Sequence, residues 1–145
     1  MIELIVSTVI TAGSALLFGY WFRYTCVLIL SAKTVRNYAG EVATAHQLGF
    51  EKVQSQLAGS DTENLTRLEQ TLAGDYAVVR SLLDRVENQQ SCLETRVLRV
   101  HYRIMRAWFG ISNRLSPRIA REALREMCQV VAYLANGVGE AAAAA

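Results

Sequence analysis

The stretch GYWFRYTCVLIL, residues Gly19 to Leu30, places one arginine inside the most apolar part of the chain. Arg23 lies in a run from Met1 to Ala32 whose only other charged residue is Glu3. An arginine at the centre of a bilayer costs about 2.5–3.5 kcal/mol on insertion scales, whereas one at the headgroups can extend its charge into water. The position of Arg23 therefore decides where a membrane span ends.

A span over residues 2–22 satisfies this constraint. At ~1.5 Å per residue it is about 31 Å long, close to the ~30 Å hydrocarbon core of a bilayer. It leaves Arg23 at the interface beside Tyr20, Trp21 and Tyr24, an aromatic belt of the kind that anchors a helix at the membrane surface. A secretory signal peptide is the alternative, but no basic residue precedes the apolar run, and the run continues past its small residues. We expect a retained anchor.

The flanking charges predict the orientation. Arg23, Lys33 and Arg36 follow the span, and only Glu3 and the amino terminus precede it. By the positive-inside rule, the N-terminus lies outside and the C-terminal domain is cytoplasmic, as in a bacterial inner membrane.

Small residues recur on one face of the expected span. Their spacing of i, i+4, i+7 and i+11 would let another helix approach closely. The alternative is that this face merely contacts lipid. The members of the small-residue face are Thr8, Ala12, Ala15 and Gly19.

The apolar residues after Arg23 lie outside the hydrocarbon in this register. A free helix would expose Val27, Leu28 and Leu30 to water. We expect a partner to cover them.

The rest of the chain predicts an all-α protein. It contains one proline and no alternating strand pattern, and 52% of all residues are apolar. We expect one transmembrane helix that continues into a cytoplasmic helical hairpin or bundle, with about four helices in total. The expected divisions are an anchor and juxtamembrane helix over 1–32, a helical domain over 33–138 and a tail over 139–145.

Four segments of the chain carry helical patterns. The first, 32–58, is expected to continue the span, and the second, 61–88, has apolar residues at seven-residue spacing. That spacing favours an antiparallel hairpin or a short bundle. A turn is expected at 89–91, although one unbroken helix to residue 109 is the alternative. The third helix covers 92–113, and the last begins at Pro117 and ends at Asn136-Gly137.

The third helix is expected to bury one apolar stripe. Its members follow helical spacing and include the second tryptophan of the chain: Leu93, Val97, Val100, Ile104, Trp108 and Ile111.

Charge is unevenly distributed after the anchor. Acidic residues predominate from Glu41 to Glu94 and arginines from residue 95 to Arg125. This basic surface would suit an acidic partner protein or anionic lipid, or it would pair internally with the acidic helical segment 61–94. Nucleic acid is disfavoured, because Trp108 and Phe109 resemble core residues rather than stacking platforms. The arginines expected to form the surface are Arg96, Arg99, Arg103, Arg106, Arg118, Arg121 and Arg125, with Arg114 between them.

The sequence offers no recognisable catalytic, cofactor or metal motif. Three widely separated cysteines predict inert thiols rather than a disulfide framework or zinc site. These patterns favour a non-catalytic accessory or scaffold subunit of a larger membrane complex, without a cofactor. A self-assembling membrane-anchored coiled-coil adaptor is the alternative. An enzyme is a remote third, and it would require convergence of His46, Cys92, Glu94 and His101.

Overall fold

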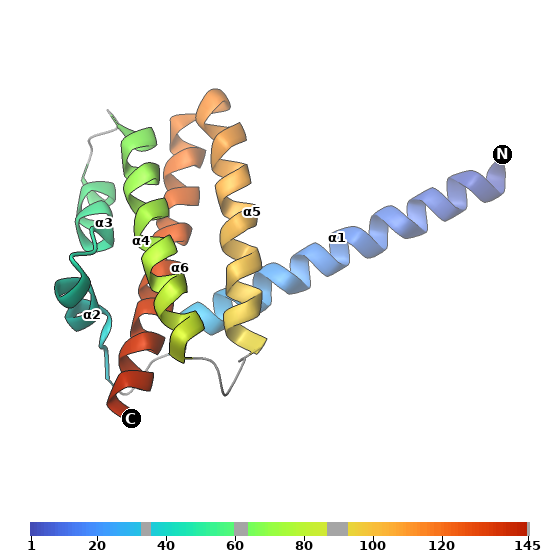
Figure 1. Ribbon diagram of the computed structural model, residues 1–145. Helices are drawn as coiled ribbons and strands as arrows, with labels where there is room; N and C mark the ends of the chain where they lie inside the picture. The colour runs from blue at the N-terminus through green and yellow to red at the C-terminus, as the bar shows by residue number, and fades with distance from the viewer. Residues whose placement is uncertain (33–35, 60–63, 87–92, 145) are drawn as a thin grey trace. The chain divides into compact units, whose positions relative to one another are not determined.

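The computed structural model describes residues 1–32, 36–59, 64–86 and 93–144, and these form six α-helices and no strand. The all-α prediction is confirmed, whereas the expected number of about four helices is wrong. The chain divides into two compact units, residues 1–32 and 33–145. Figure 1 shows the helices of each unit.

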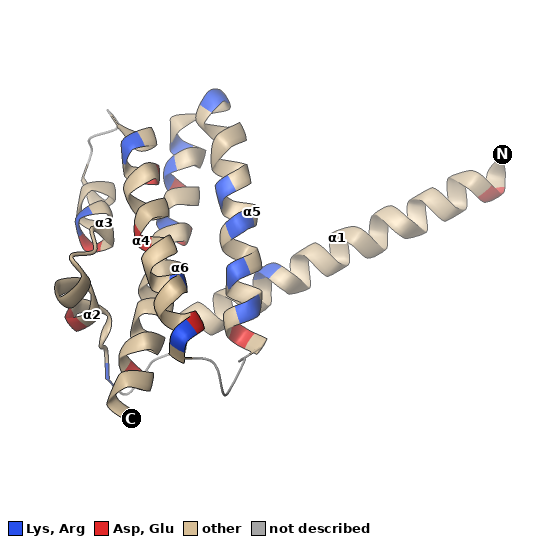
Figure 2. Ribbon diagram, in the orientation of Figure 1, with Lys and Arg blue, Asp and Glu red and all other residues tan. Residues whose placement is uncertain are grey.

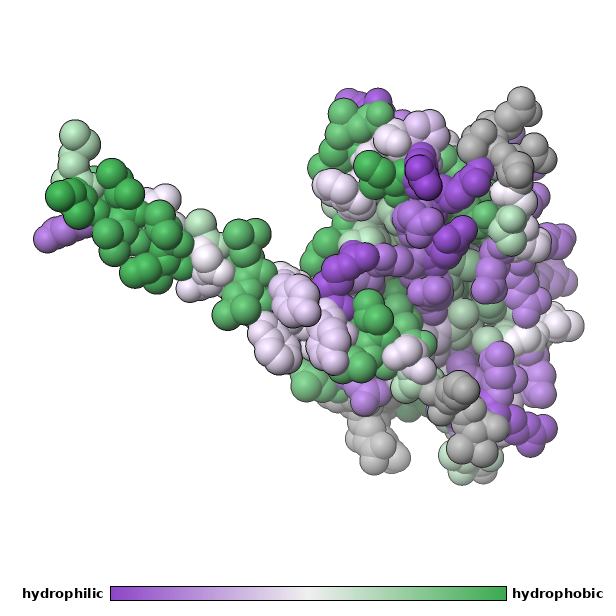
Figure 3. All heavy atoms as spheres, turned by 180° about the vertical axis from the view of Figure 1, so that it is seen from behind, coloured by the Kyte–Doolittle hydropathy of each residue, from purple (hydrophilic) through white to green (hydrophobic). Residues whose placement is uncertain are grey.

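The first unit is the single helix α1 (Ile2–Ser31). It is long and apolar enough to cross a membrane. No other helix among the described residues meets both conditions. Two hydroxyl groups of α1 donate within the helix, Thr8 Oγ1 to the Leu4 carbonyl at 2.7 Å and Thr11 Oγ1 to the Ser7 carbonyl at 2.8 Å. Such internal bonds suit hydrocarbon, which supplies no partner for a polar group. Figure 3 shows that apolar side chains cover much of this helix, with residues of intermediate hydropathy between them.

The second unit contains α2 (Ala39–His46), α3 (Phe50–Ala58), α4 (Leu65–Val86), α5 (Leu93–Leu115) and α6 (Pro117–Ala144). The last helix is the centre of this unit, since it packs against all four of the others. The three longest helices of this unit, α4, α5 and α6, lie side by side (Figure 1). The apolar side chains that α6 buries include Leu124, Met127, Val130, Val131 and Leu134.

Helices α4 and α5 run antiparallel. Arg99 contacts Asp84, Arg106 contacts Glu69 and Asn113 contacts Thr66, so the pairs progress in opposite directions along the two helices. On α4, Leu65, Leu72 and Val79 of the seven-residue pattern are buried, while Val86 at the end is exposed. The expected antiparallel hairpin or short bundle is thus confirmed in its coarser form, a helical bundle in which α4 and α5 run antiparallel. The expected turn at 89–91 falls outside the described residues.

The single helix expected over 32–58 is wrong, because the chain breaks it twice. The first helix ends at Ser31, and Gln47 takes a left-handed conformation (φ 54°) between α2 and α3. Distant side chains satisfy the backbone groups that these breaks leave open. Asn136 Oδ1 accepts the Tyr38 N–H at 2.6 Å, and Asp75 Oδ2 accepts the Gly49 N–H at 2.8 Å. These caps lie far away in sequence, so local periodicity cannot reveal them.

The expected helix end at Asn136-Gly137 is also wrong, because α6 continues to Ala144. Asn136 is buried in the helix and uses its amide to hold the entry to α2 rather than to end α6. Gly139 lies directly against Tyr38, and a Cβ at this position would overlap the Cβ of that tyrosine. The residues expected to form a tail thus include part of the packing surface for α2.

A comparison of two glycines in α6 tests this close approach. We expect Gly139→Ala to destabilise the second unit by about 1–3 kcal/mol, because the new methyl group forces Tyr38 away. Gly137 has open space beside it, so Gly137→Ala should be neutral or should stabilise the helix by about 0.5–1 kcal/mol. Thermal unfolding of the detergent-solubilised chain, followed by far-UV circular dichroism, measures both. Equal effects of the two substitutions would contradict the packing.

The cap on α3 predicts a dependence on pH. Burial raises the pKa of Asp75 above its ordinary value of 3.8, although backbone hydrogen bonds from Gly49 and Phe50 oppose the rise. The folded protein then binds this proton more tightly than the unfolded chain does. Stability contributed by Asp75 therefore falls as pH rises from 3.8 through the folded pKa.

Asp75→Asn keeps a hydrogen-bond acceptor at this position and removes the titration. We expect its free energy of unfolding to improve relative to the natural protein between pH 4 and pH 7. Urea unfolding at the two pH values measures the difference, and a relative loss of stability in the variant would contradict the raised pKa.

Candidate interaction surface

Two apolar faces lie next to each other on α5. The buried face consists of Leu98, His101, Tyr102, Met105, Phe109 and Ser112. The other lies about 115° round the helix at ~3.6 residues per turn. We call it the exposed stripe, and it consists of Leu93, Val100, Ile104, Trp108, Ile111 and Leu115, which are 43–76% exposed. The prediction that most of these residues form the core is therefore wrong.

Specific contacts explain why this face of α5, rather than the exposed stripe, is buried. Tyr102 stacks on Tyr76 of α4, with the rings 3.8 Å apart and 8° from parallel. Stacking of two aromatic rings contributes roughly 0.5–1.5 kcal/mol beyond the area that they bury. On the side toward α6, His101 Nε2 lies 3.3 Å from a carboxylate oxygen of Glu126. Helical periodicity cannot distinguish this face from the exposed stripe, since both recur with the same period.

The arginines of α5 form two rows. Arg99 and Arg106, seven residues apart, face α4, whose carboxylates they bind: Arg99 Nη2 lies 2.7 Å from Asp84, and Arg106 Nε lies 2.9 Å from Glu69. For these two arginines, the alternative of internal pairing with the acidic helix is confirmed.

The second row borders the exposed stripe. Arg96, Arg103 and Arg114 are spaced by 7 and 11 residues, close to whole numbers of helical turns, and all three are exposed. No carboxylate among the described residues forms an ion pair with any of them. We call these three arginines the border row. Figure 2 shows how basic residues recur along α5. Sequence reasoning treated Arg114 as an extension of the surface, but its spacing from Arg103 indicates membership of this row.

The remaining predicted arginines belong to α6. Arg118 and Arg125 are exposed, and Arg125 Nη1 lies 3.0 Å from Glu122 of the same helix. Arg121 is half-buried, and its Nη2 has no hydrogen-bond partner within the described part of the chain. These side chains do not extend the border row as one continuous line, because they lie on a different helix.

The predicted residues of the first unit all lie on α1. The small-residue face is open, as no atom comes within 4 Å of a Cβ built at Gly19. Tyr20 stacks with Tyr24, and Trp21 meets Tyr24 edge to face, so three of the expected belt residues form one aromatic cluster. Val27, Leu28 and Leu30 lie in the last two turns, where Val27 and Leu28 are half exposed.

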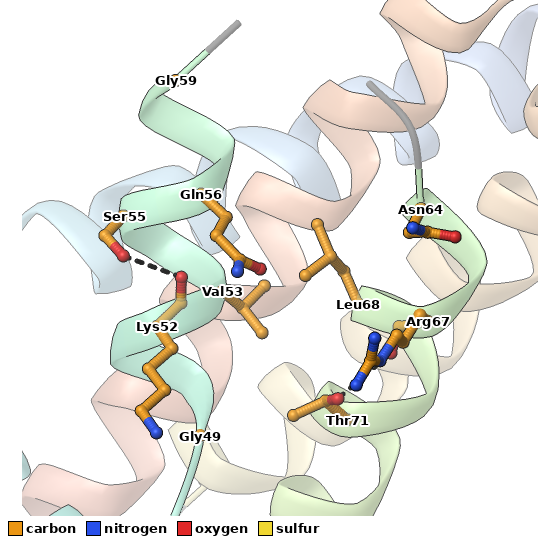
Figure 4. Close-up of a pocket in the computed structure, with 10 residues that line it drawn as sticks. All are labelled: Gly49, Lys52, Val53, Ser55, Gln56, Gly59, Asn64, Arg67, Leu68 and Thr71. Carbon is orange, nitrogen blue, oxygen red and sulfur yellow. Dashed lines mark hydrogen bonds between the residues drawn. The ribbon is translucent and has the colours of Figure 1, made fainter. Parts of the chain in front are cut away.

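An open hollow of ≈ 630 Å³ lies between α3 and α4 (Figure 4). Lys52 and Arg67 enter its lining from opposite helices, and Gln56 and Leu68 point toward each other across it. The hydroxyls of Ser55 and Thr71 donate to carbonyls of their own helices. Its described lining contains no carboxylate, histidine or cysteine.

The described groups suggested for an enzyme belong to two helices, His46 to α2 and both Glu94 and His101 to α5. His46 is exposed at the end of α2, and Glu94 Oε2 accepts a hydrogen bond from Tyr133 at 3.1 Å, while Cys92 lies outside the described residues. Cys128 is buried and donates its S–H to the Phe50 carbonyl at 3.2 Å, and burial raises its pKa to about 11. This thiol is therefore protonated and unreactive at neutral pH. Within the described ranges, no group of three metal-ligating side chains comes together.

Comparison with protein-family models, with curated proteins and with solved structures found no match for this chain.

Truncation of one residue from each face of α5 tests which face is buried. We expect Leu98→Ala to lower the free energy of unfolding by about 2–5 kcal/mol, because it opens a cavity in the core. Ile104→Ala, from the exposed stripe, should cost less than about 1 kcal/mol. Urea unfolding measures both values. A larger loss for Ile104→Ala than for Leu98→Ala would show that the stripe belongs to the core.

Proposed function

We propose that the protein is a non-catalytic accessory or scaffold subunit of a larger membrane complex. The observation that carries the proposal is the open small-residue face of α1, a helix of sufficient length and apolar character to span a bilayer. Helices in lipid associate through close packing at such faces. Orientation with the N-terminus outside and the second unit in the cytoplasm follows from Arg23, Lys33 and Arg36.

The juxtamembrane residues support the same function. Val27 and Leu28 lie beyond Arg23 and remain half exposed, so they offer apolar surface to another subunit.

Self-assembly through the heptad helix is the weaker proposal. The apolar residues that would pair between copies, Leu65, Leu72 and Val79, are buried within the unit itself. A catalytic function has no supporting cluster among the described side chains.

Substitution within α1 tests the proposal. We expect Gly19→Leu to reduce the yield of co-purifying membrane subunits by roughly fivefold or more, since the larger side chain separates the packed helices. Gly13→Leu is the matched control, because Gly13 also has open space beside it but lies on a different face of α1. Affinity purification from native membranes, with quantification of the partners, measures the effect. Unchanged recovery with Gly19→Leu, or equal loss with both variants, would argue against the docking face.

A further inference from the structure

We propose that the exposed stripe of α5 lies on the anionic lipid surface of the membrane in which α1 is anchored. The stripe and the border row together form one strip of helix surface, apolar along its middle and basic along one edge. Helices that rest in a bilayer interface have this composition, with their apolar side chains at the boundary between headgroups and acyl chains and their basic side chains among the phosphates.

The charges on α5 favour an anionic lipid surface as the occupant of the stripe. The border row has no carboxylate partner in the described part of the chain, in contrast to Arg99 and Arg106, whose charges are already compensated by α4. The one acidic residue of α5, Glu94, binds the Tyr133 hydroxyl. Three uncompensated positive charges beside an apolar stripe therefore complement a negatively charged surface.

The side chains of the stripe suit the interface as well. Trp108, at 46% exposure, is the amphipathic residue that favours the headgroup level, while Ile104 and Ile111 supply purely apolar surface on either side of it. Leu115 ends the stripe at 76% exposure. In water this much apolar surface is unfavourable, and the boundary of the bilayer removes that cost.

The proposal rests on the anchoring part of the proposed function and is independent of any partner subunit. A tether to the membrane keeps the second unit close to lipid, so weak individual contacts are enough to hold the stripe on the surface. An arginine near an anionic surface contributes roughly a fivefold change in equilibrium, so the border row contributes on the order of a hundredfold.

The two tryptophans of the chain make the test direct. We would place single copies of the full chain in nanodiscs of either phosphatidylcholine or a mixture with phosphatidylglycerol, and measure quenching of tryptophan fluorescence by brominated lipids. In the Trp108→Phe protein, Trp21 reports insertion of α1. In the Trp21→Phe protein, Trp108 reports docking of the stripe.

We expect Trp21 to be quenched in both lipid mixtures, and Trp108 to be quenched in the anionic mixture and much less in pure phosphatidylcholine. Combined Arg96→Gln, Arg103→Gln and Arg114→Gln substitutions should abolish most of the Trp108 quenching. The matched control is Arg67→Gln, Arg80→Gln and Arg85→Gln on α4, which removes the same charge and should leave the quenching nearly unchanged. Circular dichroism of each variant establishes that the second unit is folded.

Quenched Trp21 together with unquenched Trp108 in the anionic mixture would overturn the proposal and leave the anchor intact. Equal effects of the two triple variants would also overturn it, because the border row would then have no special role. If Trp108 becomes shielded only in discs that hold two copies, without quenching by lipid, a second copy covers the stripe and the lipid proposal is wrong.

Discussion

The burial of α6 is the interaction on which the second unit depends. This helix contacts α2, α3, α4 and α5, and its apolar side chains are buried along most of its length. Complete burial of a leucine or methionine contributes about 1.5–3 kcal/mol, so residues such as Leu124, Met127 and Leu134 supply a large share of the driving force. Two positions add specificity near its end. Asn136 binds the backbone before α2, and Gly139 lets Tyr38 approach.

The sequence allowed prediction of the helical class, the apolar N-terminal helix and the helical bundle, because each depends on local composition or periodicity. The breaks around α2 and the length of α6 could not be predicted in this way. They depend on Asp75 and Asn136, whose side chains bind backbone groups that are distant in sequence. For the cap on α3, the available signal was Asp75, a charged residue at seven-residue spacing from both Leu68 and Leu82.

The buried face of α5 illustrates the same difficulty in the candidate surface. Two faces of one helix carry apolar residues with the same period, and only contacts with Tyr76 and Glu126 distinguish them. The arginine pattern was visible in the sequence, but its division into a paired row and an unpaired row required the position of α4. Together these features indicate that both units have surfaces suited to a membrane setting: α1 through its length and apolar character, and α5 through its exposed stripe and border row.

Retention of α1 in the mature protein is the claim on which the functional account rests. The most direct test is the intact mass of the protein recovered from native membranes after alkaline extraction, which removes peripheral proteins. The account predicts that the full-length chain, including residues 2–31, stays in the membrane pellet. Recovery of a shorter chain without α1 in the soluble fraction would contradict it, because the N-terminal helix would then be a cleaved signal sequence rather than an anchor.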